Sequence, residues 1–353
     1  MDKKGVFQID HSLKPVLAIT IGDASGIGPE ICLKALQDEA VYRSCKPVLI
    51  GDLNILSFYL ERLKLPLQLN PITKISNAKF TPGVIDLFHL DTIDMNRFQF
   101  GEGDSMTGKA MVDYTKLAVD LAVKGEVDAV IGGPHTKSAV EKAGLFFDGY
   151  PSLIAQLTNT KEEETFLMLV SDHFRVVNVT LHVPMKRALE LIKHPLIFKA
   201  IQASHHAGKM LGIHDPKIAV AGLNPHASEG GLYGVEEQCE IIPAITQAKE
   251  ASMDVQGPFG SDILFAEMGH YDIYLAMYHD QAHIPMKMKA FKQISALTIG
   301  TPVLFSSIGH GSAPDIAGKG IADPSGLLKT IQLLCNVKSK KSDSYYKKTM
   351  KGV

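Results

Sequence analysis

The stretch VLAITIGDASGIGPEICLKALQD, residues 16–38, contains one complete unit of the fold. Residues 16–21 are apolar or β-branched and predict a buried strand. Glycine-rich residues 22–28 follow, and Pro29 stands in the first turn of a helix expected over 30–38. A strand, a tight turn and a helix in this order form the repeating unit of a parallel sheet covered by helices.

The same alternation continues along the chain. A helix expected over 109–124 carries apolar residues at helical spacing and ends at Gly125. Further strands are expected at 47–50, 127–131, 166–170, 176–181, 218–221 and 273–277, and further helices at 54–63, 185–192, 195–211 and 235–251. We therefore predict an α/β fold with a largely parallel sheet.

The length of the chain predicts two domains, because 353 residues exceed what one hydrophobic core usually organises. Clusters of glycine and proline are the local signals for the boundaries. We expect a first α/β domain of residues 1–144 together with 286–353, which would carry a cofactor loop. The second α/β domain, residues 145–285, would carry the metal and substrate site and the dimer contacts.

Composition limits the class of protein. Hydrophobic residues make up 45% of the chain and charged residues 21%, as in globular proteins. The net charge of −2 gives no basic field for nucleic acid, and no apolar run of about 18 residues predicts a membrane span. We expect a cytoplasmic protein with a small-molecule substrate, and a solvated basic terminus over 338–351. The cysteines form no Cys-x-x-Cys pair and are expected to be reduced core thiols: Cys32, Cys45, Cys239 and Cys335.

Three histidines stand in short polar segments that follow apolar runs. They are His182 in TLHVP, His226 in NPHASEGG and His279 in YHDQAHIP. In open α/β sheets, ligands bind outside the carboxyl ends of strands, which is where these side chains are expected. Imidazole suits zinc and its transition-metal neighbours, and three histidines leave coordination positions open for a substrate. We therefore predict a catalytic site for one divalent ion, with Asp262 and Asp280 nearby in the chain.

A single histidine is more often a surface or satisfied buried residue than a ligand, and the chain has 14 of them. The metal prediction depends on three of them occurring at three strand ends. The identity of the ion stays open between Zn, Co, Mn and Mg, because histidine and carboxylate ligands accept each of these.

The two glycine-rich loops are interpreted differently. Residues 22–30 match neither the dinucleotide fingerprint nor a phosphate-binding loop, so a tight strand-to-helix turn is favoured over a ligand site. Residues 310–324, HGSAPDIAGKGIADP, resemble the adenosine loop of the NAD-linked isopropylmalate and isocitrate dehydrogenases. The resemblance implies that NAD rather than NADP binds here, because a carboxylate repels a 2′-phosphate. The implied contacts are His310, Gly311, Ala313 and Asp315, with Asp315 holding ribose hydroxyls; a purely structural loop is the alternative.

Longer motifs resemble a narrower family, the 4-hydroxythreonine-4-phosphate dehydrogenases of vitamin B6 synthesis. They are ITIGDASGIGPE at 19–30, TGKA at 107–110, GLNPHASEGG at 222–231 and MYHDQ at 277–281. The resemblance extends over residues 16–334. It implies the isocitrate/isopropylmalate dehydrogenase-like fold, with two α/β domains flanking a central cleft, and a homodimer.

The family resemblance also implies roles for individual residues. By position, His182, His226 and His279 match metal ligands that the family shares across its dimer interface. Asp262 and Asp280 match acidic residues beside the metal. Lys287 matches a lysine that binds the substrate.

Four of the five substrate contacts that can be placed from this family are changed. GYPS at 149–152 replaces Gly-His-Thr-Glu, which puts Tyr150 and Pro151 at two substrate positions. Ala296 replaces an asparagine, and Phe305 replaces an arginine. Arginine binds phosphate through a fork of N–H groups, and phenylalanine offers no donor.

Two explanations of these changes stay open. In the first, other residues bind the phosphate group, such as Lys289, Lys292 or Ser306. In the second, the substrate is a less charged hydroxy acid or a cyclic diol, and Tyr150 and Phe305 form an apolar wall beside it.

The implied activity is the oxidation of a hydroxy acid, in which a divalent ion lowers the pKa of the substrate hydroxyl and hydride passes to NAD. A 3-keto acid product could then lose carbon dioxide. We expect Asp262 and Asp280 to orient ligands or transfer protons, and Lys287 to neutralise a substrate carboxylate or phosphate. A non-catalytic binder of metal and nucleotide is the alternative from another class. An acyl transferase of related fold is disfavoured, because it would have no use for the Asp315 loop.

Overall fold

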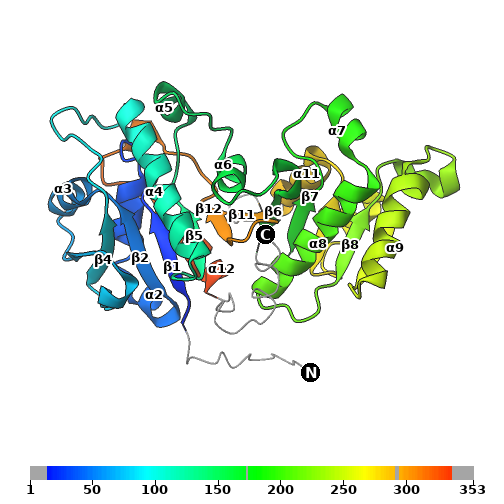
Figure 1. The fold of residues 1–353 in the computed structure, drawn as a ribbon, viewed down its shortest axis with the longest axis horizontal. Coiled ribbons are helices and arrows are strands. Elements are labelled where there is room, and N and C mark those ends of the chain that lie inside the picture. Colours follow the sequence, from blue (N-terminus) through cyan, green and yellow to red (C-terminus); the bar gives the residue numbers. More distant parts are fainter. Residues whose placement is uncertain (1–13, 172–173, 291–293, 336–353) are drawn as a thin grey trace.

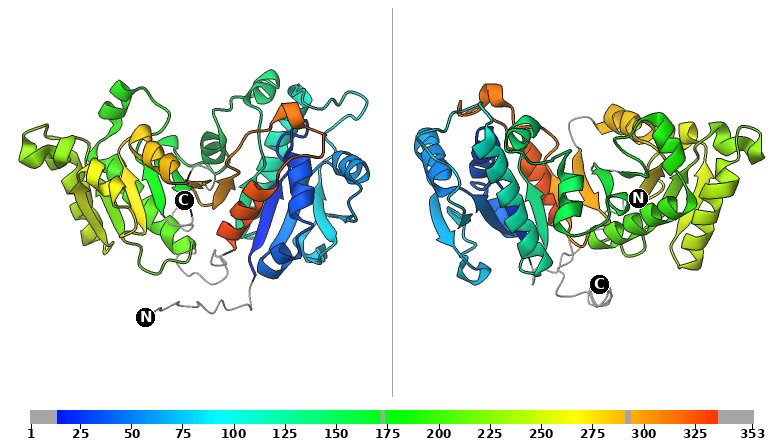
Figure 2. Two further views of the ribbon diagram at one scale, coloured as in Figure 1. Left: turned by 180° about the vertical axis from the view of Figure 1, so that it is seen from behind. Right: turned by 45° about the horizontal axis from the view of Figure 1, so that its top comes forward.

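The computed structural model of this chain describes residues 14–171, 174–290 and 294–335. The described strands form one sheet, with helices on both faces (Figures 1 and 2). In sheet order they are β3 (Gln68–Ile72), β4 (Val84–His89), β2 (Lys46–Gly51), β1 (Val16–Thr20), β5 (Ala129–Gly132), β12 (Phe305–Ser307), β11 (Ser295–Ile299), β6 (Phe166–Val170), β7 (Arg175–Asn178), β10 (Ile273–Ala276), β8 (Ile218–Ala221) and β9 (Val255–Phe259). The α-helices are α1 (Gly28–Ala35), α2 (Glu39–Ser44), α3 (Leu53–Leu63), α4 (Ser105–Val123), α5 (Lys137–Lys142), α6 (Tyr150–Leu157), α7 (Met185–Leu191), α8 (His194–Met210), α9 (Ile242–Glu250), α10 (Ser261–Ala266), α11 (His279–Ala290) and α12 (Ser325–Leu334).

Strand direction divides the sheet into two parallel blocks joined by an antiparallel centre. Neighbouring strands are parallel from β3 to β12, and again from β7 to β9. Between the blocks, β11 is antiparallel to both β12 and β6, and β6 is antiparallel to β7. The predicted α/β fold is confirmed, and its sheet is less uniformly parallel than we predicted.

Helices bury both faces of each block. In Figure 1, α4 lies in front of β1 and β5, while α8 and α9 lie in front of β8; the view from behind in Figure 2 brings α12 and α11 forward. Successive residues of β8 belong to different hydrophobic clusters: Ile218 and Val220 to the larger, Ala219 and Ala221 to the smaller. Burial on both faces explains why these strands are continuous apolar runs in the sequence.

The end of the described chain returns to the first parallel block. There β12 pairs with β5, and α12 packs against α1 and α2. The boundaries at residues 144 and 285 stay a prediction, because the sheet continues from one block into the other. None of the helices in the described ranges combines the length and apolar character that a membrane span needs.

Several elements differ from their predicted bounds. The helix expected from 109 begins at Ser105, because Asp104 and Thr107 form a capping box. The helix expected over 235–251 is a π-helical turn at Glu237–Ile241 followed by α9, since Pro243 lacks the N–H that a continuous α-helix needs.

Two further predictions concern the cysteines and the basic C-terminal segment. Cys239 is exposed, so the prediction that all four cysteines are core thiols is wrong for this residue. The basic segment 338–351 lies outside the described residues.

Candidate active site

His182 and His279 lie side by side beyond the ends of two neighbouring strands. The N–H of Thr180, after β7, donates to the carbonyl of Met277, after β10, at 3.1 Å. Each histidine lies two residues beyond this bond, and the centroids of their rings are 5.7 Å apart. The strand β7 is shorter than predicted and ends at Asn178, yet its pairing with β10 still sets the separation of the two imidazoles.

Neighbouring side chains fix the ring of His279. Its Nδ1 lies 2.6 Å from Asp280 Oδ1, which leaves Nε2 as the free ring nitrogen. The ring of His283 lies against it, tilted by 34° with centroids 3.8 Å apart, and His283 Nε2 lies 3.0 Å from Asn178 Nδ2. Sequence reasoning missed His283, although its spacing of four residues from His279 in a helix is a signal that the two rings share one face.

The two histidines that flank His279 are held in the neutral form. Burial, followed by the charges of His279 and Lys287, lowers the pKa of His283 to about 4. Partial burial and the charge of His279 also lower the pKa of His182. Neutral imidazole is the form that binds a divalent ion. Lys287 is exposed, and it follows His283 by four residues in α11, so the two side chains lie on one face of the helix.

The geometry fits part of the predicted metal site. Two imidazoles that bind one ion through bonds of ~2.1 Å have ring centres roughly 5 Å apart, so the separation of 5.7 Å between His182 and His279 suits a shared ion. Within the described residues, no group of three or more His, Cys, Asp or Glu side chains is arranged to hold an ion. His226 therefore does not complete the predicted trio inside one chain.

His226 lies beside Asp262 in a second group. A methyl group on Gly260 would lie 3.1 Å from Asp262 Oδ1 and 3.6 Å from the Cα of His226. Both residues are exposed, and Asp262 lies in the first turn of α10. The chain thus carries the predicted ligands in two separate groups.

The main chain around His226 has an unusual conformation. Residues 226–230 all have positive φ, from 45° to 73°, although only the last is glycine. Such backbone costs non-glycine residues on the order of 1 kcal/mol or more each, so other contacts must hold it. Gln238 contributes one, since its Nε2 donates to Ser228 Oγ at 3.1 Å. Fully buried Glu237 fixes the residues that lead into this segment. Its Oε1 accepts the N–H groups of Leu223 at 2.8 Å and Asn224 at 2.7 Å, and its Oε2 accepts the Asn224 amide at 2.9 Å.

Gln281 connects the two groups. Its Nε2 donates to the carbonyl of Gly222 and to Ser261 Oγ, each at 2.7 Å, and its Oε1 accepts the N–H of Met277 at 2.6 Å. One amide therefore joins the start of α11 to both loops of the second group.

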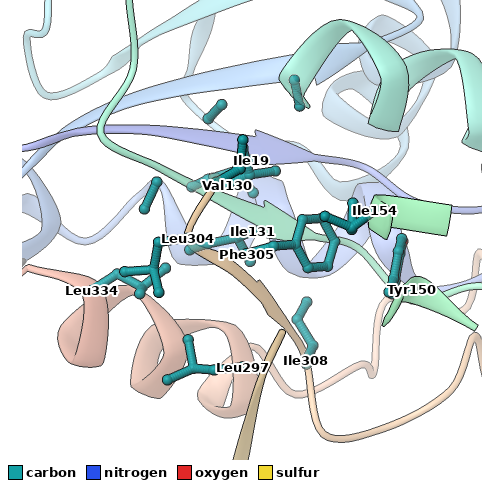
Figure 3. Packing of buried hydrophobic residues seen from close by; sticks show 14 of the residues in the cluster. Ile19, Val130, Ile131, Tyr150, Ile154, Leu297, Leu304, Phe305, Ile308 and Leu334 are labelled. Carbon is teal, nitrogen blue, oxygen red and sulfur yellow. The ribbon is translucent and has the colours of Figure 1, made fainter. Parts of the chain in front are cut away.

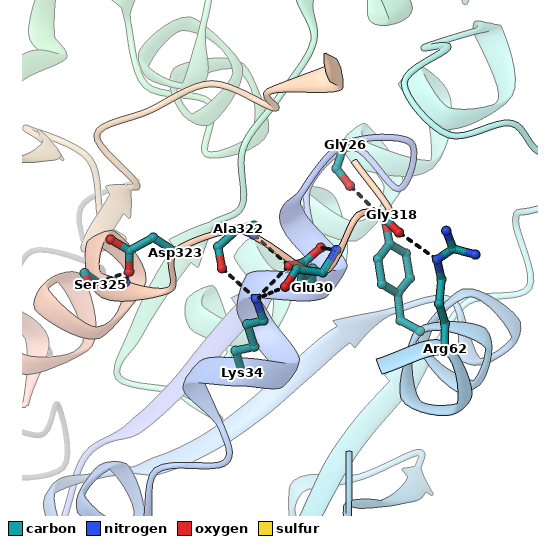
Figure 4. A network of polar contacts seen from close by, with 10 residues as sticks. Gly26, Glu30, Lys34, Arg62, Gly318, Ala322, Asp323 and Ser325 are labelled. Carbon is teal, nitrogen blue, oxygen red and sulfur yellow. Dashed lines mark hydrogen bonds and ion pairs between the residues drawn. The ribbon is translucent and has the colours of Figure 1, made fainter. Parts of the chain in front are cut away.

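The predicted NAD loop, residues 310–324, is anchored to the first parallel block (Figure 4). Buried Glu30 accepts the N–H of Ala322 at 2.8 Å and of Gly320 at 3.2 Å. Lys34 donates to the carbonyls of the same two residues and forms an ion pair of 2.7 Å with Glu30. These contacts fix the far end of the loop against α1.

The residues predicted to contact NAD remain accessible in this loop. His310, Gly311 and Asp315 are exposed, and Ala313 is half-buried with a φ of 41°. The carboxylate of Asp315 is therefore free to accept hydrogen bonds from an incoming group. That this group is NAD stays a prediction.

Tyr150 and Phe305 fill the core instead of lining a wall (Figure 3). Phe305 has no exposed surface, Tyr150 is 2% exposed, and their ring centroids are 4.8 Å apart. The Tyr150 hydroxyl donates to the carbonyl of Gly133 at 2.6 Å. As placed, neither side chain can touch a substrate, and the apolar wall of the second explanation is absent. The reason is their depth, since Phe305 belongs to β12 in the interior of the sheet.

The remaining predicted substrate positions are also partly enclosed. Pro151 and Ala296 are half-buried. Ser306 is fully buried and donates to the carbonyl of Ala296 at 3.2 Å, so it is not available to a phosphate group. Lys289 is exposed and donates to the last carbonyl of α10 at 2.9 Å, and Lys292 lies outside the described residues.

Sequence reasoning also missed Lys137. Its Nζ donates to the carbonyl of Asp148 at 2.6 Å and pairs with the carboxylate of Asp148 at 3.4 Å. Its charge contributes to lowering the pKa of both His135 and His182. The Gly-Gly-Pro sequence at 132–134, directly after β5, is the signal that could have drawn attention to this segment.

His135 should make the stability of the protein depend on pH. Burial, followed by the charge of Lys137, lowers its pKa from 6.5 to about 4. Because the unfolded chain binds this proton more readily, stability should be lost as the pH falls through this range. The variant His135→Phe keeps an aromatic ring edge-on to Phe147 and Tyr150. Urea unfolding at several pH values should show that, as the pH falls, the free energy of unfolding of this variant decreases by about 1–2 kcal/mol less than that of the wild type. Identical pH profiles would contradict this role of His135.

Comparison with known proteins identifies first the class and then the family. The fold is that of solved α/β dehydrogenases. The chain belongs to the family of the pyridoxal phosphate biosynthetic protein PdxA, whose family model matches residues 43–334. The resemblance inferred from the sequence motifs is thereby confirmed.

Three relatives illustrate the range of this family. A protein of Oceanobacillus iheyensis, described as a candidate D-threonate 4-phosphate dehydrogenase, is 39% identical over 324 residues, which cover 91% of this chain and 97% of the relative. The structure of a 4-hydroxythreonine-4-phosphate dehydrogenase from Burkholderia phymatum matches with a TM-score of 0.85 and 35% identity, covering 93% of this chain and 99% of that one. The structure of a terephthalate 1,2-cis-dihydrodiol dehydrogenase from Burkholderia xenovorans LB400 matches with a TM-score of 0.73 and 36% identity, covering 91% and 98%. The family is thus one of oxidoreductases with small-molecule substrates.

Proposed function

We propose that this protein is an NAD-dependent dehydrogenase that requires a divalent ion and oxidises a hydroxyl group of a small, unphosphorylated hydroxy acid or cyclic diol. The observation that carries the proposal is the pair His182 and His279, whose rings stand 5.7 Å apart beyond neighbouring strands. The accessible carboxylate of Asp315 supports the choice of NAD as the hydride acceptor.

The choice of an unphosphorylated substrate rests on the contact between Tyr150 and Phe305. These buried rings occupy positions where related enzymes are expected to hold phosphate, and Phe305 offers no N–H donor. A relative named for a cis-dihydrodiol, at 36% identity, supports the same choice. The second candidate is a phosphorylated substrate such as D-threonate 4-phosphate or 4-hydroxythreonine 4-phosphate, the latter with a role in pyridoxine synthesis. It is favoured by the names of two relatives and by the exposed amines of Lys287 and Lys289.

Different residues of the chain have different roles in the proposed reaction. A divalent ion bound at His182 and His279 supplies the positive charge that makes a substrate hydroxyl more acidic. Asp280 holds His279 in the tautomer with Nε2 free. The exposed carboxylate of Asp262 is a candidate proton acceptor, and the exposed ammonium of Lys287 neutralises a substrate carboxylate.

We propose further that two copies of the chain share each site. His226, the third expected ligand, stands apart from the other two within one chain. Exposed apolar side chains occur in the segments that carry or follow the two groups, and a partner could cover them: Met185, Leu189, Leu232, Val235, Ile263, Ile284 and Met288. A second copy that placed its His226 beside His182 and His279 would complete the ligand set and bury this surface.

A substrate panel tests the proposed function. We expect NADH formation, followed by absorbance, with unphosphorylated hydroxy acids or cyclic diols in the presence of a divalent ion, and no turnover after chelation. NAD should also raise the thermal unfolding temperature of the protein. Turnover of phosphorylated compounds alone would establish the second candidate. No turnover and no shift with any dinucleotide would favour a non-catalytic binder.

A further inference from the structure

A buried polar pair joins β7 to α11 and has no role in the reaction proposed above. Asn178, the last residue of β7, is 1% exposed, and His283 is 7% exposed. His283 Nε2 lies 3.0 Å from Asn178 Nδ2. The side-chain oxygen of Asn178 has no hydrogen-bond partner within the described residues. A buried oxygen without a donor is costly, so packing alone does not explain an asparagine at this position.

The surroundings of this pair are apolar. Val176, two residues before Asn178 in β7, points to the same face of the sheet and belongs to a buried cluster with Ala282 and Met286 of α11. Ala276 of β10, which pairs with Asn178 in the ladder, belongs to this cluster too. An apolar residue at position 178 would suit these neighbours without leaving an oxygen unpaired. Departures of this kind from the rules of stable packing are expected mainly at functional sites.

The pair reaches the proposed metal ligands through one ring contact. His283 follows His279 by four residues in α11, which places both rings on one face of the helix. Their centroids are 3.8 Å apart, with an angle of 34° between the ring planes. Carbon atoms at this distance are in direct contact, so the ring of His283 prevents the ring of His279 from turning toward that side.

The contact between His279 and Asp280 restrains the imidazole less well than this buried ring does. The side chain of Asp280 is 67% exposed and that of His279 is 32% exposed. Water competes for a carboxylate with this exposure, and holding two exposed side chains together costs conformational entropy. Asp280 therefore selects which nitrogen of His279 is free, while His283 limits where that nitrogen points.

His283 is itself poorly placed to bind the ion. The amide nitrogen of Asn178 can only donate, so His283 Nε2 accepts and the proton of the neutral ring is on Nδ1. In this arrangement neither nitrogen of His283 offers a free lone pair. The described residues accordingly contain no group of three His, Cys, Asp or Glu side chains arranged around one ion.

Resting on the proposed binding of a divalent ion by His182 and His279, we propose that His283 is a positioning residue for His279 and that Asn178 anchors it. The pair connects α11, which carries His279, to the strand that leads to His182. It thereby helps to hold the two rings at the separation of 5.7 Å that suits a shared ion. The pair sets the affinity for the ion without touching it.

Binding of Co²⁺ to the wild type and to three variants tests this role. Calorimetry measures the affinity, and the visible absorption of the bound ion reports the geometry of its ligands. His283→Ala should weaken binding by roughly 10–100-fold and alter the absorption bands, as for other groups that orient metal ligands. Asn178→Ala should weaken binding by about tenfold. The double variant should bind no more weakly than His283→Ala, because Asn178 acts through His283.

Two further variants separate positioning from other roles. His283→Phe keeps a flat ring against His279 and removes both nitrogens, so it should bind Co²⁺ more tightly than His283→Ala does. Met286→Ala removes another buried side chain of α11 from the same cluster, so it should lower stability but leave the affinity for Co²⁺ within about threefold. If His283→Ala does not fold, Asn178→Ala and His283→Phe still decide the question.

Several results would overturn the role of His283. They are unchanged Co²⁺ binding in His283→Ala, additive losses in the double variant, and a loss in Met286→Ala as large as that in His283→Ala. Binding to His283→Phe as weak as to His283→Ala would show that a nitrogen of His283 is a ligand. Each of these results leaves the proposed metal dependence intact. A wild type that does not bind Co²⁺ or any other divalent ion would overturn the proposed function together with this inference.

Discussion

Replacing His279 with alanine should lower dehydrogenase turnover by more than about a hundredfold, because groups that only orient metal ligands are already worth roughly 10–100-fold. The ring of His279 stands at the centre of its group, beside His182, Asp280 and His283. Divalent-ion binding, measured by calorimetry, should weaken in parallel with activity. His214→Ala is the matched control, because that histidine is exposed and pairs with its neighbour Asp215.

Mixing inactive variants should reveal whether two chains share the site. His226→Ala and His279→Ala affect different groups, so a hybrid dimer keeps one complete site if each site combines both groups. Random reassembly should therefore restore about a quarter of the wild-type activity. A mixture of His182→Ala and His279→Ala should stay inactive, since both changes affect the same group. Failure of the first mixture to recover would contradict a shared site, and full activity of the single variants would refute the metal site itself.

Replacing Phe305 with alanine should lower the free energy of unfolding by about 3–5 kcal/mol, as for other large aromatic residues in a core. Its ring is fully buried against Tyr150 and within reach of Gly132, where an added methyl group would lie only 2.4 Å from Phe305 Cζ. Denaturant unfolding measures the loss. Tyr150→Phe is the control, because it keeps the ring and removes only the hydrogen bond to Gly133, worth about 1 kcal/mol.

The two possible roles of Phe305 predict different results. If the side chain supports the core, Phe305→Ala lowers the midpoint of denaturant unfolding strongly, whatever the substrate of the enzyme is. A small change in stability combined with a large rise in KM would instead show that the ring contacts the substrate. That result would contradict the conclusion that Phe305 fills the core.

The strands and helices were largely predictable because both faces of the sheet are covered. Runs such as 218–221 are apolar throughout, and the helices between them carry apolar residues at helical spacing. Strand direction was not predictable in the centre of the sheet. The sequence of β6 is apolar and that of β11 is mostly so, and neither indicates strand direction; their antiparallel pairing depends on where the chain re-enters the sheet.

The candidate site was predictable in its residue types and less so in its arrangement. His182 and His279 follow apolar runs, and the pairing of β7 with β10 brings them together as expected. The left-handed backbone at His226 had no local signal beyond two glycines, because the side chains that bind Ser228 and the residues before His226 come from the next helical segment, at Gln238 and Glu237. The burial of Phe305 could not be read from its identity either, since an aromatic side chain suits a pocket wall and a core equally well.

The antiparallel centre of the sheet limits how the molecule can move. Many two-domain enzymes close on a substrate by rotation about a few hinge residues. Here the main-chain ladder passes through β12, β11, β6 and β7 without interruption. We expect a rearrangement that brings the 310–324 loop nearer to the histidine pair to be distributed as small changes of twist over several strands. Motion about a single hinge between two rigid domains is not expected.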